Sequence, residues 1–186
     1  QYDDEPNNPN VACLITFEGT LVYEDLWPSK GDYDFNDMVS GYEIVHAIHA
    51  MGYVHEVRAN YELKAVGAGY NNGFGTLMSD DIAKSDIASI SGRTSFGSHL
   101  PLDGDLQGTP SDVVMYNWDA TTDLVVQDIN VGKFFNTVVG GGKGNFVTEN
   151  IVIEMVSGNV QQWELGLPPY NAFIFANQQT DVEIHL

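Results

Sequence analysis

The sequence contains a single cysteine, few basic residues and no long apolar run, and each absence excludes a class of protein. Cys13 alone cannot form an intrachain disulfide. Seven lysines and arginines stand against 26 aspartates and glutamates, which gives the 186-residue chain a formal net charge of −19. A chain this acidic repels phosphate backbones and anionic lipid surfaces, so we expect neither nucleic acid nor such a membrane surface as a partner.

Membrane-spanning and catalytic motifs are also missing. No stretch approaches the about 18 consecutive apolar residues that indicate a transmembrane helix, so no membrane insertion is expected. Neither a Gly-x-Ser-x-Gly elbow nor a His-Glu-x-x-His zinc motif occurs. His46 and His49 would face opposite sides of a strand, and the glycine-rich run at 140–145 lacks the Lys-Ser/Thr ending of a phosphate loop. We therefore expect a protein that is not an enzyme.

Apolar and aromatic residues, by contrast, are abundant enough for a core. Hydrophobic residues make up 43% of the chain, which argues against disorder despite the charge, and the length is that of one domain. The first ten residues are polar and include Pro6 and Pro9, so we expect a linker at 1–10 and a single domain at 11–186. Because the chain begins with Gln1 rather than Met, we expect a processed or excised piece of a longer protein.

The dominant hydrophobic period is two, which predicts strands. From His55 to Ala65 the odd positions are mostly apolar and the even positions polar, the pattern of a strand with one wet face. Further strands are expected at 13–17, 38–45, 113–118, 124–129, 146–156, 172–176 and 182–186. Only 80–89 indicates a short helix. This order of elements predicts an all-β fold, an antiparallel β-sandwich of jelly-roll type with long loops, including a surface excursion at 92–112.

One acidic segment, between the first two predicted strands, stands apart. Residues 23–37 contain five carboxylates, one asparagine and a single lysine. Asp32, Asp34 and Asn36 recur at every second position, so a turning loop directs their oxygens to one centre while the residues between them point elsewhere. Oxygen donors without His or Cys suit Ca²⁺, which takes about six to eight oxygens, better than Mg²⁺, which demands a stricter octahedron.

The predicted calcium ligands lie on both sides of a turn at Trp27-Pro28. Four of them follow the turn, and Glu24 or Asp25 completes the shell from the end of the preceding strand. The four that follow are Asp32, Asp34, Asn36 and Asp37. An EF-hand is rejected, because Asp37 occupies the position that requires glycine and strands rather than helices flank the loop. The alternative is an exposed acidic turn that binds nothing.

The acidic segment also carries a family resemblance. Residues 23–39, Tyr-Glu-Asp-Leu-Trp-Pro-Ser-Lys-Gly-Asp-Tyr-Asp-Phe-Asn-Asp-Met-Val, resemble the hallmark of LruC-domain proteins. The resemblance continues in four shorter segments, at 64–68, 72–75, 169–174 and 183–186. It implies a domain of bacterial envelope or secreted proteins, extracellular or at the cell surface, and a similar Asp-x-Asp-x-Asn-Asp signature in bacterial adhesins supports metal binding. Asp4–Pro9 resembles the end of the Asp-rich calcium-binding repeats that often precede this domain.

These features together predict a non-enzymatic, calcium-binding β-sandwich module of an exported bacterial protein, acting in surface attachment or scaffolding. Two alternatives stay open. In a calcium-dependent glycan-binding module, an exposed Trp or Tyr beside the metal would contact a cell-surface glycan; a protein ligand is equally compatible with the leading prediction. A glycoside hydrolase would need a cleft with two facing carboxylates. We expect four large aromatic residues in the core rather than on a sugar-binding surface, namely Trp118, Phe134, Phe135 and Trp163.

Overall fold

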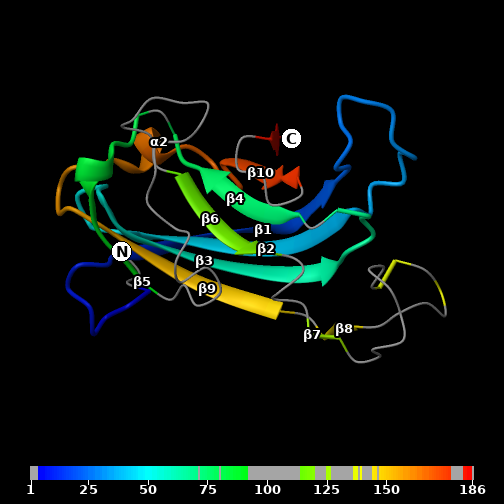
Figure 1. Cartoon of the computed structure of the whole chain (residues 1–186). Helices are drawn as coiled ribbons and strands as arrows, with labels where there is room; N and C mark the ends of the chain where they lie inside the picture. Colours follow the sequence, from blue (N-terminus) through cyan, green and yellow to red (C-terminus); the bar gives the residue numbers. More distant parts are fainter. Residues whose placement is uncertain are drawn as a thin grey trace.

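The structure is a computed structural model, and it places two antiparallel sheets face to face (Figure 1). It describes residues 4–70, 72–79, 81–91, 114–119, 125–126, 136–137, 139, 144–145, 147–176 and 182–185. The first sheet consists, in spatial order, of β1 (Cys13–Tyr23), β2 (Met38–Ile48), β3 (Val54–Ala65), β9 (Val147–Met155) and β5 (Ile87–Ser91). The second consists of β11 (Glu183–His185), β10 (Asn171–Phe175), β4 (Gly73–Leu77) and β6 (Val114–Asp119). A separate ribbon pairs β7 (Val125–Val126) with β8 (Gly144–Asn145).

The prediction of an all-β antiparallel sandwich is confirmed. All strand pairs among the described residues are antiparallel, and β1, β2 and β3 form a continuous meander. The chain then alternates between the layers, crossing at β3–β4, β4–β5, β5–β6 and β9–β10. Alternation between two packed antiparallel sheets is typical of a jelly-roll type of sandwich, while the β1–β2–β3 meander stays within one sheet.

The core lies between the two sheets and is centred on β3. From Val57 to Ala65 every second residue of this strand is buried, as the alternating sequence predicted. The ring of Tyr61 packs edge-on against Phe74 of β4 at 5.1 Å between centroids, and its hydroxyl lies 3.2 Å from the Thr76 hydroxyl. Burying one such large side chain contributes about 1.5–3 kcal/mol, so this row of residues fixes which face of β3 points inward.

The predicted helix at 80–89 is wrong. The described part of this segment forms a short 3₁₀ turn, η1 (Lys84–Asp86), and then enters β5. Ile87 and Ile90 of β5 pack against the core beside β9, and this pairing outweighs the local helical signal. A one-turn helix, α2 (Gln162–Leu165), was not predicted, and Trp163 on it is 73% exposed rather than in the core.

Several other expectations fall on residues that the structure does not describe. Phe134, Phe135, the 92–112 excursion and most of the 140–145 turn lie outside the described ranges. Within those ranges, no helix has the length and hydrophobicity to cross a membrane.

The polar residues before β1 are held against the sandwich by hydrogen bonds. The backbone N–H of Leu14 donates to Asp4 Oδ2 at 2.9 Å. Glu5 forms an ion pair with Arg58 of β3, at 2.6 Å between Oε1 and Nη1. The same guanidinium also binds Glu56, so both carboxylates raise the pKa of Arg58. The predicted linker therefore contacts the first sheet through Asp4 and Glu5.

His46 is a buried imidazole on the core face of β2. Its Nε2 lies 2.7 Å from the hydroxyl of Tyr170, and the two rings are parallel with centroids 6.0 Å apart. Its Nδ1 has no hydrogen-bond partner among the described residues. Burial favours the neutral ring and lowers the pKa of His46 to about 4.

This buried histidine predicts a loss of stability in acid. The unfolded chain binds a proton on His46 near pH 6.5, whereas the folded protein resists protonation until about pH 4. Because only the unfolded chain takes up this proton between pH 6.5 and pH 4, the free energy of unfolding falls over that interval as the pH is lowered. The total loss is roughly 3 kcal/mol. His46→Gln, which cannot ionise but can still bond Tyr170, should flatten this part of the pH profile in chemical denaturation. His55→Gln is the control, and parallel profiles for wild type and His46→Gln would contradict the assignment.

Candidate metal centre

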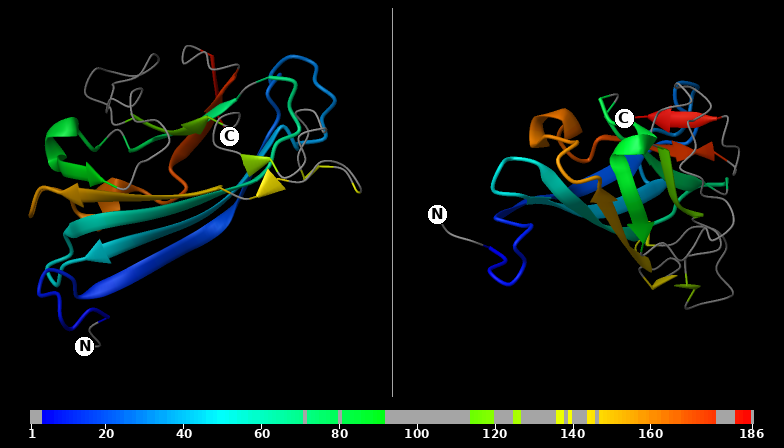
Figure 2. Two further views of the ribbon diagram at one scale, coloured as in Figure 1. Left: turned by 60° about the horizontal axis from the view of Figure 1, so that its bottom comes forward. Right: turned by 90° about the vertical axis from the view of Figure 1, so that its left-hand side faces the viewer.

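The acidic segment forms the connection between β1 and β2 at one end of the sandwich. Tyr23 and Met38 are the last residues paired across these strands, so residues 24–37 project as a loop beyond the sheet. Because β3 runs antiparallel to β2, the connection from β3 to β4, residues 66–72, leaves the sheet at the same end. Figure 2 (left) shows both connections side by side, at the far end of the molecule from the described N-terminal residues.

Three carboxylates of this loop converge on one point. Glu24, Asp32 and Asp34 each place an oxygen within 4.8 Å of the others. Glu24 is 3% exposed, whereas Asp32 and Asp34 are exposed. No lysine or arginine forms an ion pair with them in the part of the chain that the structure describes. Three negative charges at this spacing repel one another unless a cation or protons compensate them.

Glu24 is the buried member of this cluster, so solvent does not screen its repulsion from the other two carboxylates. Its Oε2 is buried and has no hydrogen-bond partner among the described residues. Gly31 lies directly against the same carboxylate, and a Cβ on this glycine would overlap Glu24 Oε1. Burying a carboxylate oxygen without a donor costs several kcal/mol in an apolar setting, so this group is suited to a bound cation.

A second layer of buried polar groups lies behind the cluster. The backbone N–H of Asp25 donates to Asp37 Oδ2 at 2.7 Å, and the side-chain amide of Asn72 donates to Asp25 Oδ2 at 3.0 Å. All three residues are buried. Burial raises the pKa of Asp37 to about 7; repulsion from Asp25 and Glu24 adds to this, and the Asp25 N–H partly offsets it. The site therefore holds more negative charge than its surroundings stabilise.

The β3–β4 connection fixes the acidic loop from its other side. Asn36 donates its amide to Asp34 Oδ2, which orients one carboxylate of the cluster. The backbone N–H of Gly67 donates to the Asp37 carbonyl at 3.2 Å. A Cβ on Gly67 would overlap Asn36 Oδ1, so only glycine permits this approach. The two connections thus form one packed unit.

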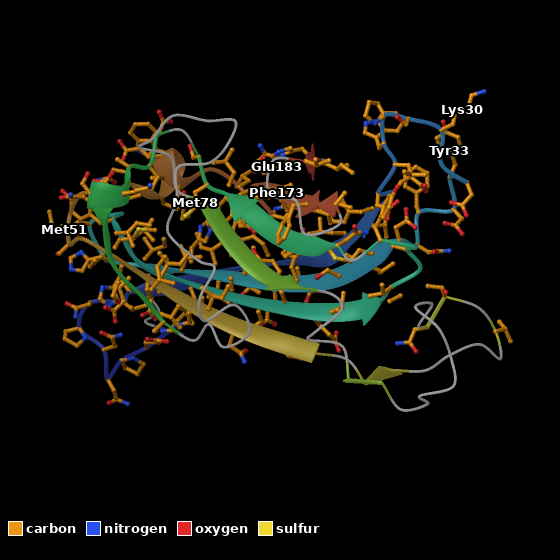
Figure 3. All side chains as sticks on the ribbon, viewed as in Figure 1. Lys30, Tyr33, Met51, Met78, Phe173 and Glu183 are labelled. Carbon is orange, nitrogen blue, oxygen red and sulfur yellow. The ribbon has the colours of Figure 1, made fainter. Side chains whose placement is uncertain are left out.

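The residues between the acidic side chains adopt a strained backbone. Tyr33 and Phe35 have φ values of 58° and 52°, in the left-handed region that bulky residues avoid. These two positions alternate with Asp32, Asp34 and Asn36 along the loop; the sequence spacing did not predict their left-handed backbone. Both rings are about half exposed, and Figure 3 shows Tyr33 with Lys30 at the outer edge of the loop.

The six predicted ligands all lie in or beside this centre, but in two shells. The cluster contains three of them, Glu24, Asp32 and Asp34. Asp25, Asn36 and Asp37 take part in the hydrogen bonds that surround it. Sequence reasoning missed three supporting residues, namely Gly31, Gly67 and Asn72. The last two belong to the short segments 64–68 and 72–75, whose resemblance to the same family was the one available signal.

Comparison with known families covers the chain from β3 onward but neither the acidic loop nor β1 and β2, the strands that flank it. A family model described as "Domain of unknown function (DUF4842)" matches residues 52–186, which is most of the chain, so the chain belongs to this family. The match includes the 66–72 connection, while the loop at 24–37 precedes it. No curated protein and no solved structure matches the chain.

The contact between Gly67 and Asn36 generates a prediction with a matched control. Gly67→Ala should lower the free energy of unfolding by about 1–3 kcal/mol, because the added methyl group displaces Asn36 and loosens the loop. Gly69→Ala, two residues away, adds a methyl group that meets nothing within 4 Å and should change little. Urea denaturation measures both variants. Equal losses in the two would show that the Asn36 contact is unimportant.

Proposed function

We propose that the protein is a non-enzymatic, calcium-binding β-sandwich module of an exported bacterial protein, acting in surface attachment or scaffolding. The observation that carries the proposal is the buried Glu24 carboxylate, which has an oxygen without a described donor and faces the exposed carboxylates of Asp32 and Asp34. A cation at this point would supply the missing partner and offset the repulsion.

The donor chemistry favours calcium over other common metals. The cluster offers only carboxylate oxygens, and among the described residues neither His nor Cys takes part in it. Calcium accepts an irregular shell of oxygens, whereas magnesium requires near-octahedral geometry and retains its waters. At about 1 mM extracellular calcium, a site with a dissociation constant of about 10⁻⁴ M would be mostly filled and would stabilise the fold by about 1.4 kcal/mol.

The geometry favours a cation over hydrolysis. The carboxylate oxygens of the cluster lie within 4.8 Å of one another. Paired catalytic carboxylates of glycoside hydrolases stand about 5–9.5 Å apart, with the substrate between them. The resemblance of residues 23–39 to LruC-domain proteins and the net charge of −19 support an exported module. The attachment or scaffolding role rests on that resemblance.

The first test removes an exposed ligand. Asp34→Ala should lower the melting temperature by a few degrees more in calcium than in EDTA, because the hydrogen bond from Asn36 is lost in both buffers whereas the bond to the ion is lost only in calcium. Asp81→Ala, which removes an exposed carboxylate outside the cluster, should have no calcium-dependent effect. Equal losses for Asp34→Ala in both buffers would exclude Asp34 as a ligand.

The second test uses the buried ligand, and its effect should change sign. Glu24→Gln preserves the shape of the side chain and removes its charge. In EDTA the variant should melt at a higher temperature than wild type, because a buried negative charge beside Asp32, Asp34 and Asp37 is gone. In calcium it should melt lower, because a ligand is lost. A shift of the same sign in both buffers would contradict the role proposed for Glu24.

A further inference from the structure

Large aromatic side chains are exposed on the loop that holds the acidic cluster. Trp27 is 54% exposed, Tyr33 49% and Phe35 48%. The backbone N–H of Trp27 donates to the main-chain carbonyl of Glu24 at 3.2 Å, so a turn joins this residue to the one that bears the buried carboxylate. Tyr33 and Phe35 are direct neighbours of Asp34 along the chain. Burying an aromatic ring lowers the free energy, and these three rings are only partly buried. A ligand that covers them would therefore gain binding free energy.

The cluster also leaves coordination positions for a ligand. Its three carboxylates, each acting through one oxygen, would supply three donors, fewer than the about six to eight that calcium takes. Two of the three, Asp32 and Asp34, are exposed, so the open side of a bound ion would face solvent. Glu24 would bind the ion from the buried side. The coordination positions on the solvent side would remain for water or for oxygens of another molecule.

We propose that this outer side binds a neutral carbohydrate in a calcium-dependent manner, an inference that rests on the proposed calcium site. Vicinal hydroxyl groups of the sugar complete the calcium shell, and the apolar C–H face of the ring stacks on one of the exposed aromatic rings. Residues 32–35 alternate carboxylate and aromatic side chains. The exposed rings and the open side of the cluster thus belong to one loop, residues 24–37, which offers both oxygen ligands and apolar rings, and a pyranose has groups that match both.

The charge and the exposure pattern favour a sugar over the other classes of partner. A net charge of −19 opposes approach to an anionic lipid surface, whereas a neutral glycan is not repelled. The core of a protein–protein interface is depleted in charged residues, whereas here exposed carboxylates accompany the rings on the same loop. The rings are about half exposed, so part of each is available for stacking.

The experiment measures glycan binding and calcium binding on the same protein. The probes are an array of neutral oligosaccharides and methyl glycosides of mannose, fucose, galactose and glucose, with phosphatidylserine vesicles as a separate arm. Each is tested in CaCl₂ and in EDTA, and the calcium-induced melting shift is recorded in parallel. Trp27→Ala removes one ring. Tyr33→Asn removes another and retains a residue that tolerates a left-handed backbone.

The matched control is Trp163→Ala, which removes an exposed tryptophan from α2, at the opposite end of the sandwich from the acidic loop (Figure 1). We expect at least one neutral glycan to bind in calcium and not in EDTA. Trp27→Ala or Tyr33→Asn should weaken that binding by roughly tenfold while keeping the calcium-induced melting shift, and Trp163→Ala should change neither.

The outcomes separate the two proposals. A normal calcium-induced melting shift without binding to any glycan on the array would overturn the glycan proposal and leave the calcium site standing. Glycan binding that survives EDTA, or that is unaffected by both loop variants, would overturn it too. Calcium-dependent binding to the vesicles alone would replace the sugar with a lipid headgroup. Absence of any calcium response would overturn both proposals.

Discussion

The candidate site depends on one constraint, the burial of a carboxylate that lacks a compensating partner. Glu24 is enclosed beside Gly31, one of its oxygens has no donor among the described residues, and two further carboxylates face it. Asp25 and Asp37 lie behind Glu24 and add negative charge at the same end of the sandwich. Folding this arrangement without a cation costs free energy, so the calcium site that we propose would link the stability of the domain to its ligand.

The sandwich makes this arrangement possible by bringing two connections to the same place. The β1–β2–β3 meander returns the chain to one end of the sheet twice, so the acidic loop at 24–37 and the connection at 66–72 meet there. Gly67 allows the close approach of Asn36, and Asn72 supports Asp25. The family match begins at residue 52, so it includes the second connection but neither the acidic loop nor the strands β1 and β2 that flank it.

Periodic and spaced patterns could be predicted from the sequence, whereas contacts between distant segments could not. The alternation along β3 gave its buried face, and the spacing of Asp32, Asp34 and Asn36 marked the acidic loop. The strand β4 has no such alternation: Gly73 is required because the ring of Phe175 lies across it from β10. The strand at 87–91 overlaps the end of the helix expected at 80–89. It depends on pairing with β9, a contact between distant segments that a local sequence pattern does not indicate.

The central claim is that the acidic loop binds calcium, and direct titration tests it best. Isothermal titration calorimetry of the EDTA-stripped protein with CaCl₂, with MgCl₂ at equal ionic strength as control, measures the ion itself rather than its effect on melting. The account predicts saturable binding with a dissociation constant of about 10⁻⁴ M or tighter, weaker binding of magnesium, and loss of the calcium signal in Glu24→Gln. No saturable calcium binding by a protein shown by elemental analysis to be metal-free would contradict it.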